Sequence, residues 1–484
     1  MRVSKQWYRA LDGMPDVWSD LCFDRRYRVM PKTAPSPSIK DLAKIVRRAG
    51  DHCRSITIRY PISFGILPKT DRKFVTLLHA TRNVSKLDMG SILESYSGDL
   101  LGTLDLSERP SWVLASLTEL NLTGQFDSAV VAAIIARSSE TLQSMTILKN
   151  QFFFDNVVPH MPQLRRFKLL STTIFTQRFD MMKLAASTPK LEQLWTEFFH
   201  DDGGAQAQTD RDRFYSLWPN LQVFVWRNSP ISGWRSVVHR TGYRKFPPIH
   251  PRRLRVLEYA PPAHLSRTPN MSVLQILPPW HRTEDAHLQN APLQGTAFDD
   301  TPFLVPSFDN LEVLRVPQDC IGPHHVKAIA EKAVADDRLR ELAIGLVNYG
   351  DRLYISDHLD GYGWLRGATS LRTLAIHNFS MSFFPPTHGP PVVRGHTENQ
   401  QNALVSFILS FPNLETLELV DREAQLEEVF PIFRRVIEAG RPKTFYYSPQ
   451  MLPGARLDEL RQLARRTSVQ LAGISMKPKR EWWD

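Results

Sequence analysis

The sequence predicts an α/β solenoid, in which short parallel strands stack side by side in one sheet and helices cover its outer side. Three observations support this prediction. A short motif with alternating apolar residues recurs along most of the 484-residue chain. Stretches with helical spacing of apolar residues lie between several copies of the motif. Proline stands two residues before several copies, where it ends the preceding segment because it cannot continue a helix.

The motif is a leucine, two variable residues, an apolar residue, one variable residue and a second apolar residue. Its copies begin at Leu117, Leu142, Leu164, Leu191, Leu221, Leu254, Leu311, Leu339, Leu371 and Leu414. Weaker copies begin at Val84 and Leu101, with outliers at Cys53 and Pro442. Within the copy at Leu414, Leu417 and Leu419 are predicted to point inward and Thr416 and Glu418 outward, as in a strand with one buried face.

Helices are predicted over residues 128–137, 179–186, 403–409 and 427–439. A single unit of strand, turn and helix cannot bury its apolar face, whereas stacked units can. The spacing between copies ranges from about 16 to about 57 residues, against ~20–29 in regular leucine-rich repeats. The predicted fold is therefore a leucine-rich-repeat-like solenoid, an irregular horseshoe with its strands on the concave face. The alternative is a non-repetitive α/β domain, which the number of aligned copies argues against.

The predicted solenoid covers residues 40–475 and contains three insertions. The first, near 200–212, is polar; the second, near 260–310, is rich in proline; the third lies near 382–400. Insertions in solenoids often lie on the binding side, although proline-rich segments are also typical of loops. Residues 476–484 form a basic tail, which resembles a nuclear-import sequence only weakly.

The first 30 residues suggest a helical segment. Their apolar and aromatic positions, Val3, Trp7, Leu11, Trp18 and Leu21, together with Met14-Pro15, resemble the second half of an F-box. Combined with degenerate leucine-rich repeats, this pattern is similar to the F-box/leucine-rich-repeat proteins abundant in filamentous fungi. The resemblance covers residues 3–21 at the level of the motif and the rest only by repeat architecture.

The resemblance implies a substrate receptor of an SCF-type ubiquitin ligase, whose F-box docks to the SCF adaptor while other subunits transfer ubiquitin. The first half of an F-box does not precede these residues. Two interpretations stay open: the sequence starts late, or adaptor binding is lost and the segment caps the solenoid, as end repeats require. Trp7 and Trp18 would then seal the first repeat.

Composition narrows the classes of partner and compartment. No apolar run approaches the ~20 residues that span a bilayer, so no membrane partner is expected. The three cysteines are far apart and odd in number, which favours a reducing compartment, the cytosol or the nucleus. The net charge of +10 is spread over short basic clusters rather than one stripe, so no nucleic-acid partner is expected.

No motif in the chain indicates catalysis. The phosphate-binding, dinucleotide-binding, zinc-protease and nucleophile-elbow patterns are absent from the sequence. The cysteines form no CxxC pair, and the aspartates at 201–212 lack the spacing of a calcium loop. We therefore expect no catalytic residue, metal or cofactor. The alternative, an enzyme contained in the insertions, predicts a deep pocket with converging ionisable groups.

If the units stack, the outward strand residues line one concave surface, which we expect to bind a protein substrate. The residues we select on it are Arg166, Lys168, Trp195, Glu197, Arg227, Glu258, Arg315 and His377. Tryptophan and arginine dominate interface energetics, although Trp195 could instead pack against a neighbouring insertion. The mixed charges favour a protein or peptide ligand. The alternative function is a stand-alone scaffold without a ligase.

Overall fold

The protein is described from a computed structural model. The structure describes residues 14–24, 39–59, 82–89, 114–123, 128–148, 159–170, 181–196, 218–227, 253–260, 308–316, 323–345, 359–377, 379, 398–420, 426–448 and 454–477. The chain divides into two compact units, Met1–His200 and Asp201–Asp484. Each unit is described by itself. The predicted insertions, residues 200–212, most of 260–310 and most of 382–400, lie outside the described residues.

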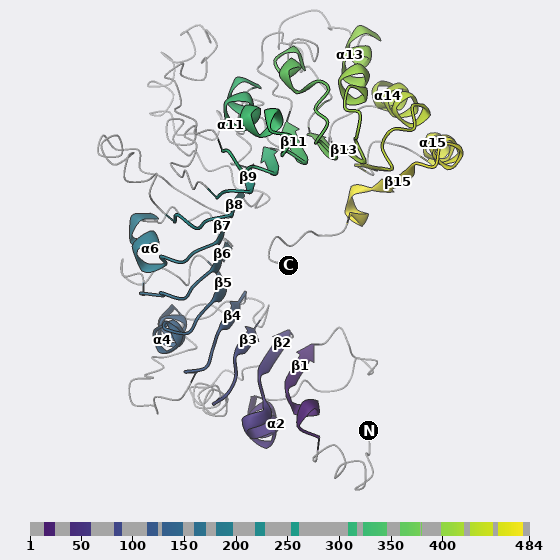
Figure 1. The fold of residues 1–484 in the computed structure, drawn as a ribbon. Coiled ribbons are helices and arrows are strands. Elements are labelled where there is room, and N and C mark those ends of the chain that lie inside the picture. The colour runs from purple at the N-terminus through teal and green to yellow at the C-terminus, as the bar shows by residue number, and fades with distance from the viewer. Residues whose placement is uncertain are drawn as a thin grey trace, which may run out of the picture. The chain divides into compact units, whose positions relative to one another are not determined.

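The first unit contains an open sheet of parallel strands whose order in space follows the chain. The strands are β1 (Asp20–Asp24), β2 (Ser55–Arg59), β3 (Lys86–Met89), β4 (Glu119–Leu122), β5 (Ser144–Leu148), β6 (Arg166–Leu170) and β7 (Gln193–Thr196). Its helical segments are η1 (Pro15–Trp18), α2 (Ile39–Ala49), η3 (Gly50–His52), α4 (Ser128–Ser138) and α6 (Met181–Ser187). Figure 1 shows α2, α4 and α6 on one side of the strands.

The second unit repeats this plan. Its parallel strands, again in chain order, are β8 (Val223–Arg227), β9 (Val256–Ala260), β10 (Val313–Val316), β11 (Glu341–Gly345), β12 (Thr373–His377), β13 (Thr416–Val420), β14 (Thr444–Tyr447) and β15 (Gln470–Gly473). Its helical segments are α11 (Pro323–Ala335), η5 (Gly363–Leu365), α13 (Glu398–Leu409), α14 (Leu426–Glu438), α15 (Gly454–Arg466) and η7 (Ile474–Met476). The helices α11, α13, α14 and α15 lie on one side of the strands (Figure 1).

One backbone pattern joins successive strands. The residue after the first leucine of the motif has a carbonyl that accepts hydrogen bonds from two consecutive N–H groups of the next repeat. The Gln143 carbonyl, for example, accepts from Arg165 at 2.8 Å and from Arg166 at 3.0 Å. The same arrangement recurs at Ser19, Arg54, Ser85, Thr118, Arg165, Gln222, Arg255, Glu312, Arg340 and Arg372. Because these backbone groups are paired in the same way, each repeat within a unit stacks on the next repeat in a fixed register.

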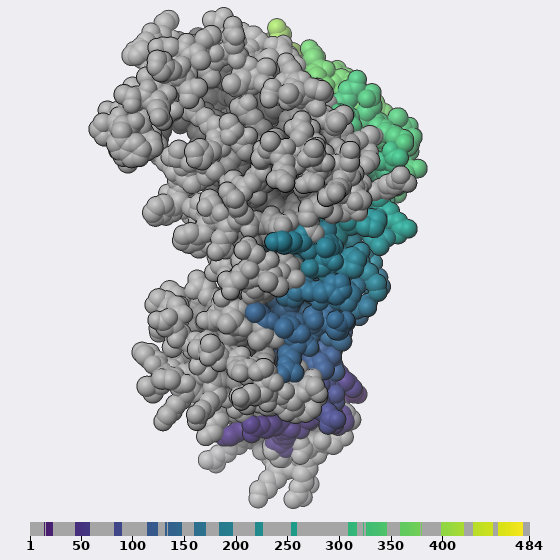
Figure 2. All heavy atoms as spheres, turned by 90° about the vertical axis from the view of Figure 1, so that its left-hand side faces the viewer, coloured from purple at the N-terminus to yellow at the C-terminus, as the bar shows by residue number. Residues whose placement is uncertain are grey.

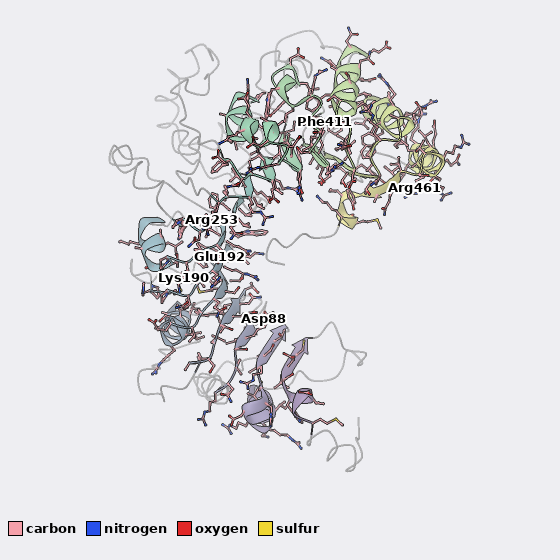
Figure 3. The ribbon with its side chains drawn as sticks, viewed as in Figure 1. Asp88, Lys190, Glu192, Arg253, Phe411 and Arg461 are labelled. Carbon is pink, nitrogen blue, oxygen red and sulfur yellow. The ribbon has the colours of Figure 1, made fainter. Side chains whose placement is uncertain are left out.

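The core lies between strands and helices. In the motif at Leu164, the first leucine, Phe167 and Leu169 are each no more than 1% exposed. In the second unit Phe411 is fully buried and meets the ring of Phe407 edge-on, with centroids 5.2 Å apart (Figure 3). Burial of one such side chain contributes about 1.5–3 kcal/mol. In the space-filling view the colours advance in chain order within each unit, as stacking requires (Figure 2).

The structure confirms the predicted α/β class with parallel strands and covering helices. The four predicted helices correspond to α4, α6, α13 and α14, with boundaries shifted by a few residues at most except at the start of α13. The weak copy at Val84 contains strand β3, and the outliers at Cys53 and Pro442 contain strands β2 and β14. The copy at Leu101 lies outside the described residues.

The N-terminal segment differs from its helical prediction. Of its described residues, 14–24, Pro15–Trp18 form a single 3-10 turn and Asp20–Asp24 forms strand β1. Trp18 occupies the position of the motif's first leucine, and the Ser19 carbonyl accepts from Arg54 and Ser55 at 2.8 and 2.9 Å. The sequence Trp18–Phe23 is therefore a further copy of the repeat, hidden by the tryptophan in place of leucine.

Candidate functional site

The candidate site lies on the face of each sheet that points away from the helices, which we call the open face. In each strand it carries the residue at the fifth position of the motif, and the parallel register aligns these residues in a central row. In the first unit the row is Cys22, Thr57, Asp88, Asn121, Thr146, Lys168 and Trp195. In the second unit it is Val225, Glu258, Arg315, Ala343, Ala375, Glu418, Tyr446 and Ala472. Figure 3 labels Asp88 on this face.

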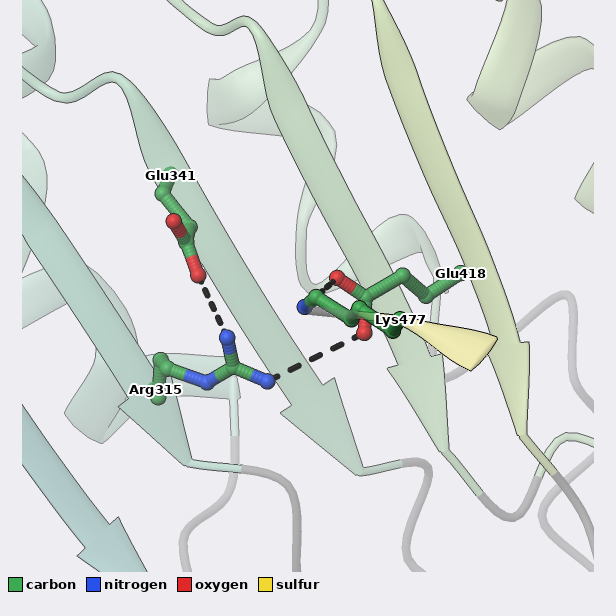
Figure 4. Close-up of polar contacts among 4 residues, drawn as sticks. All are labelled: Arg315, Glu341, Glu418 and Lys477. Atoms are coloured by element: carbon green, nitrogen blue, oxygen red, sulfur yellow. Dashed lines mark hydrogen bonds and ion pairs between the residues drawn. The ribbon is translucent and has the colours of Figure 1, made fainter. Parts of the chain in front are cut away.

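In the second unit, the central row contains a network of ion pairs around Arg315. Its Nη1 lies 2.5 Å from Glu341 Oε1, on the next strand, and its Nη2 lies 3.8 Å from Glu418 Oε2 (Figure 4). The side chains of Glu341 and Glu418 are 6% and 2% exposed, and that of Arg315 is 15% exposed. These charges are removed from water, so each depends on its partners.

The two alanines between β10 and β13 make this network possible. Neighbouring strands are about 4.8 Å apart, so the two backbones are separated by about 14 Å. Ala343 and Ala375 are the central-row residues of the intervening strands, and both are buried. Their methyl groups leave room for the long side chains of Arg315 and Glu418 to extend toward each other above the sheet.

A second cation reaches the network from a distant part of the chain. After β15 the backbone forms the 3-10 turn η7, and Lys477 follows it. The Lys477 ammonium donates to Glu418 Oε1, across 59 residues of sequence (Figure 4). Lys477 is 24% exposed while its carboxylate partner is 2% exposed. Glu418 is therefore held between two cations from different elements.

The network also determines the electrostatics of its neighbours. Burial alone lowers the pKa of Arg315, but Glu341, Glu258 and Glu418 together raise it above its ordinary value. Glu258, adjacent to Arg315 in the central row, is 4% exposed. His377 on β12 has its pKa lowered to about 3, first by burial and then by Arg315 and Lys477. Its Nε2 is out of contact with solvent and has no hydrogen-bond partner within the described residues.

In the first unit, the open face carries a cation–π pair. The Lys168 ammonium lies 3.9 Å from the centroid of the Trp195 ring. Trp195 is only 6% exposed, so it is packed on the sheet rather than presented to solvent. Arg166, in contrast, is exposed. The open face of this unit therefore offers the Lys168 ammonium over a buried aromatic ring, with the exposed Arg166 on the same strand.

Most of the residues selected from the sequence lie on strands, but the structure brings together only some of them. Arg315, Glu258 and His377 belong to the network, while Arg166, Lys168 and Trp195 lie on the first unit. Arg227 is the last residue of β8, and its side chain is outside the described set. Glu197, Val3, Trp7 and Leu11 lie outside the described residues.

Trp18 and Leu21, the other two positions of the F-box resemblance, belong to the first repeat, which contains β1. Leu21 is 9% exposed and pairs with Ile56 of β2. The Trp18 ring lies under the guanidinium of Arg48, whose Cζ is 5.4 Å from the ring centroid. Both residues are thus used in packing the end of the first unit.

Sequence reasoning did not select Glu341, Glu418 or Lys477 as members of the site, although it placed Glu418 on the outward side of its strand. Opposite charges at equivalent motif positions, with alanines in the copies between them, would have indicated that Arg315 and Glu418 interact. Glu341 occupies the outward position two residues earlier in its copy, so the same alignment would have found it. The sequence contains no comparable pattern for Lys477, which follows the last strand unit and reaches β13 only through the fold.

Other candidate sites are weaker. A hollow of about 480 Å³ in the second unit is lined by Gln222, Arg253, Arg255, Asn310, Glu312 and Arg338. Its arginines are engaged: Arg255 forms a two-point ion pair with Glu312, and Arg338 donates to Asn310 Oδ1 at 2.6 Å. The Cys53 thiol is buried, and burial together with Asp20 raises its pKa to about 11, which disfavours the reactive thiolate.

Within the described ranges, His, Cys, Asp and Glu form no group of three or more that could hold a metal ion. None of the helices in these ranges combines the length and the apolar character needed to cross a membrane. No protein-family model matches the chain, and no curated protein sequence matches it.

Proposed function

We propose that the chain is a non-catalytic recognition module that binds a protein partner on the open face of its sheets. The observation that carries this proposal is the Arg315 network. It places charged groups on a sheet face that no described helix of the second unit covers (Figure 1). Ion pairs hold these groups in position, which reduces the entropy lost when a partner binds.

The chemistry of the face favours a polypeptide ligand. Carboxylates, guanidinium and ammonium groups alternate across a few strands, so the surface has neither the uniform positive charge of a nucleic-acid site nor a wide apolar area. The buried charged side chains of the Arg315 network have low conformational freedom. They match a partner through charge complementarity, which makes the binding specific for that partner.

A narrower form of the proposal is that the chain is the substrate receptor of an SCF-type ubiquitin ligase, as its resemblance to F-box/leucine-rich-repeat proteins implies. The alternative is a stand-alone scaffold. Leu21 is buried in β1, and Trp18 is half-buried against Arg48. This packing favours a capping role for the two residues, since a packed side chain is less free to dock to an adaptor. That observation supports the scaffold alternative.

Selection of peptides from a displayed random library against the full chain tests the general proposal. Binding of the selected peptides is expected to fall at least about tenfold in Arg315→Met, a change on the open face that costs more than 1.4 kcal/mol. Arg434→Glu on the exposed side of α14 is the matched control and is expected to bind as the wild type does. Loss of binding in the control but not in Arg315→Met would contradict the proposal.

Direct binding of purified SCF adaptor distinguishes the two narrower forms. Adaptor bound by the chain, and lost in Trp18→Ala at unchanged stability, supports the ligase receptor. Adaptor that does not bind to this chain or to a longer form extended upstream supports the scaffold.

A further inference from the structure

The pairing of Lys477 with Glu418 is unusual because the acid is almost fully buried while the cation comes from outside the repeat. Glu418 is 1% exposed and lies on a central strand of the second unit. Lys477 lies beyond β15, after a 3-10 turn, on residues that belong to no strand. The strands fix the acid, whereas in the described part of the chain the short segment 474–477 holds the cation over it.

Without Lys477 the network is short of positive charge. Among the described residues, the ion pairs of Glu418 would then be reduced to the one with Arg315. Arg315 already pairs with Glu341 at 2.5 Å and reaches Glu418 only at 3.8 Å. A buried carboxylate without a close cation is strongly disfavoured, so the Glu418 position requires a second cation from some source.

The geometry points to a cation subsite on the open face. We propose that Glu418 is the subsite for a lysine or arginine side chain of a basic partner peptide, and that Lys477 occupies this subsite within the free chain. The inference deepens the proposed function and rests on it, because it names the chemistry of the partner at the open face.

Two further features suit such a partner. Lys477 is 24% exposed, so the entry to Glu418 opens toward solvent on the side from which a peptide would approach. Arg315 Nε and His377 Nε2 are buried without hydrogen-bond partners in the described structure, and they belong to the same network. A peptide backbone laid across the strands could supply the acceptor that Arg315 Nε lacks.

If Lys477 competes with the partner for Glu418, its removal has a specific effect on the affinity for a basic peptide. The apparent dissociation constant of a ligand equals its intrinsic value divided by the fraction of the protein in which its site is open. Removing Lys477 should therefore strengthen the binding of a basic peptide rather than weaken it. A lysine that merely supported the fold would give the opposite result or none.

Hexalysine binding to the full chain, measured by calorimetry at fixed ionic strength, tests the inference. In Lys477→Ala the dissociation constant is expected to fall about tenfold or more, and adding Glu418→Gln is expected to abolish the gain. Lys443→Ala is the matched control, because its pair with Glu415, at 3.0 Å, is exposed and lies just before the starts of β13 and β14. Lys477→Met, which keeps the aliphatic chain, replaces Lys477→Ala if that variant does not fold.

Equal or weaker hexalysine binding in the Lys477 variants would overturn the inference, as would the same gain in Lys443→Ala. A second measurement is thermal unfolding of Lys477→Ala in n-butylammonium chloride against sodium chloride of equal ionic strength. A saturable rise in melting temperature that needs Glu418 is expected; no difference between the salts would also overturn it. If selected peptides still map to the open face, the proposed function survives that failure.

Discussion

Arg315 on β10 and Glu418 on β13 form an ion pair across two intervening strands, with Nη2 and Oε2 3.8 Å apart. The pair spans the sheet because Ala343 and Ala375 occupy the positions between them. The same register that stacks the repeats thus creates a lane across the open face, in which buried charges from separate repeats meet. The testable consequences concern this lane, its charges and the first strand unit.

A larger side chain in the lane should displace the network. Ala343→Leu is expected to lower the free energy of unfolding by about 1–3 kcal/mol, because added methylene groups in a packed site force neighbours to shift. Ala472→Leu, in the same row on β15 but half-exposed, should change it by about 0.5 kcal/mol or less. Urea unfolding measures both, and equal effects would show that the lane is not packed.

Removing the central cation should destabilise the second unit. Arg315→Met leaves Glu341 and Glu418 with charges that are buried and under-compensated, and such a loss costs about 3–5 kcal/mol. Arg255→Met removes an arginine that pairs with Glu312 at 2.9 Å in a largely exposed position, where about 0–1 kcal/mol is expected. Chemical unfolding of the two variants compares them directly, and similar losses would contradict the burial of the network.

The stability of the protein should depend on His377 in acid. Its pKa in the folded chain is about 3, below the ordinary value of 6.5, so above pH 6.5 it is neutral in both states. As the pH falls from 6.5 toward 3, the unfolded chain binds a proton that the folded chain does not, and stability decreases by up to about 1.4 kcal/mol per pH unit.

His377→Gln should remove this share of the acid destabilisation. The difference in urea midpoint between the variant and the wild type is expected to shift in favour of the variant between pH 6.5 and pH 4. His160→Gln, at an exposed position of the first unit, provides the control. A pH-independent difference for His377→Gln would mean that the imidazole takes up its proton over the same pH range in the folded and unfolded chains, which contradicts its lowered pKa.

The first strand unit can be checked by cysteine chemistry. Cys22 on β1 is exposed, whereas Cys53 is buried with its thiol pKa raised to about 11. Iodoacetamide at pH 8 should therefore alkylate Cys22 in the native protein and Cys53 only after unfolding. Peptide mass spectrometry measures both sites in one sample. Rapid native labelling of Cys53 would contradict the packing of this end of the sheet.

The sequence was sufficient to predict the strands because the repeat is a local pattern. Leu164, Phe167 and Leu169 recur with the period of a half-buried strand, and the same spacing appears in each copy. The first repeat, Trp18–Phe23, escaped prediction because Trp18 replaces the leucine and because its residues also resemble part of an F-box. β15 escaped for a similar reason, since Ser468 and Val469 precede it in place of the motif's leucine.

The site could be predicted only in part. Glu258, Arg315 and His377 were selected because each lies at an outward position of its strand, a local property. Which of them meet depends on side-chain lengths across four strands, and in particular on the small size of Ala343 and Ala375. Lys477 depends on the direction of the chain after β15, which no repeat pattern specifies. Long-range charge pairs of this kind follow from the fold rather than from sequence spacing.

Site-specific photo-crosslinking tests the central claim most directly. A benzophenone amino acid replaces Tyr446 in the central row of β14, or Arg434 on the exposed side of α14, in the full chain bound to a selected peptide. A partner held on the open face should crosslink from position 446 and not from 434. Crosslinking from position 434 alone would place the partner on the helices and contradict the account.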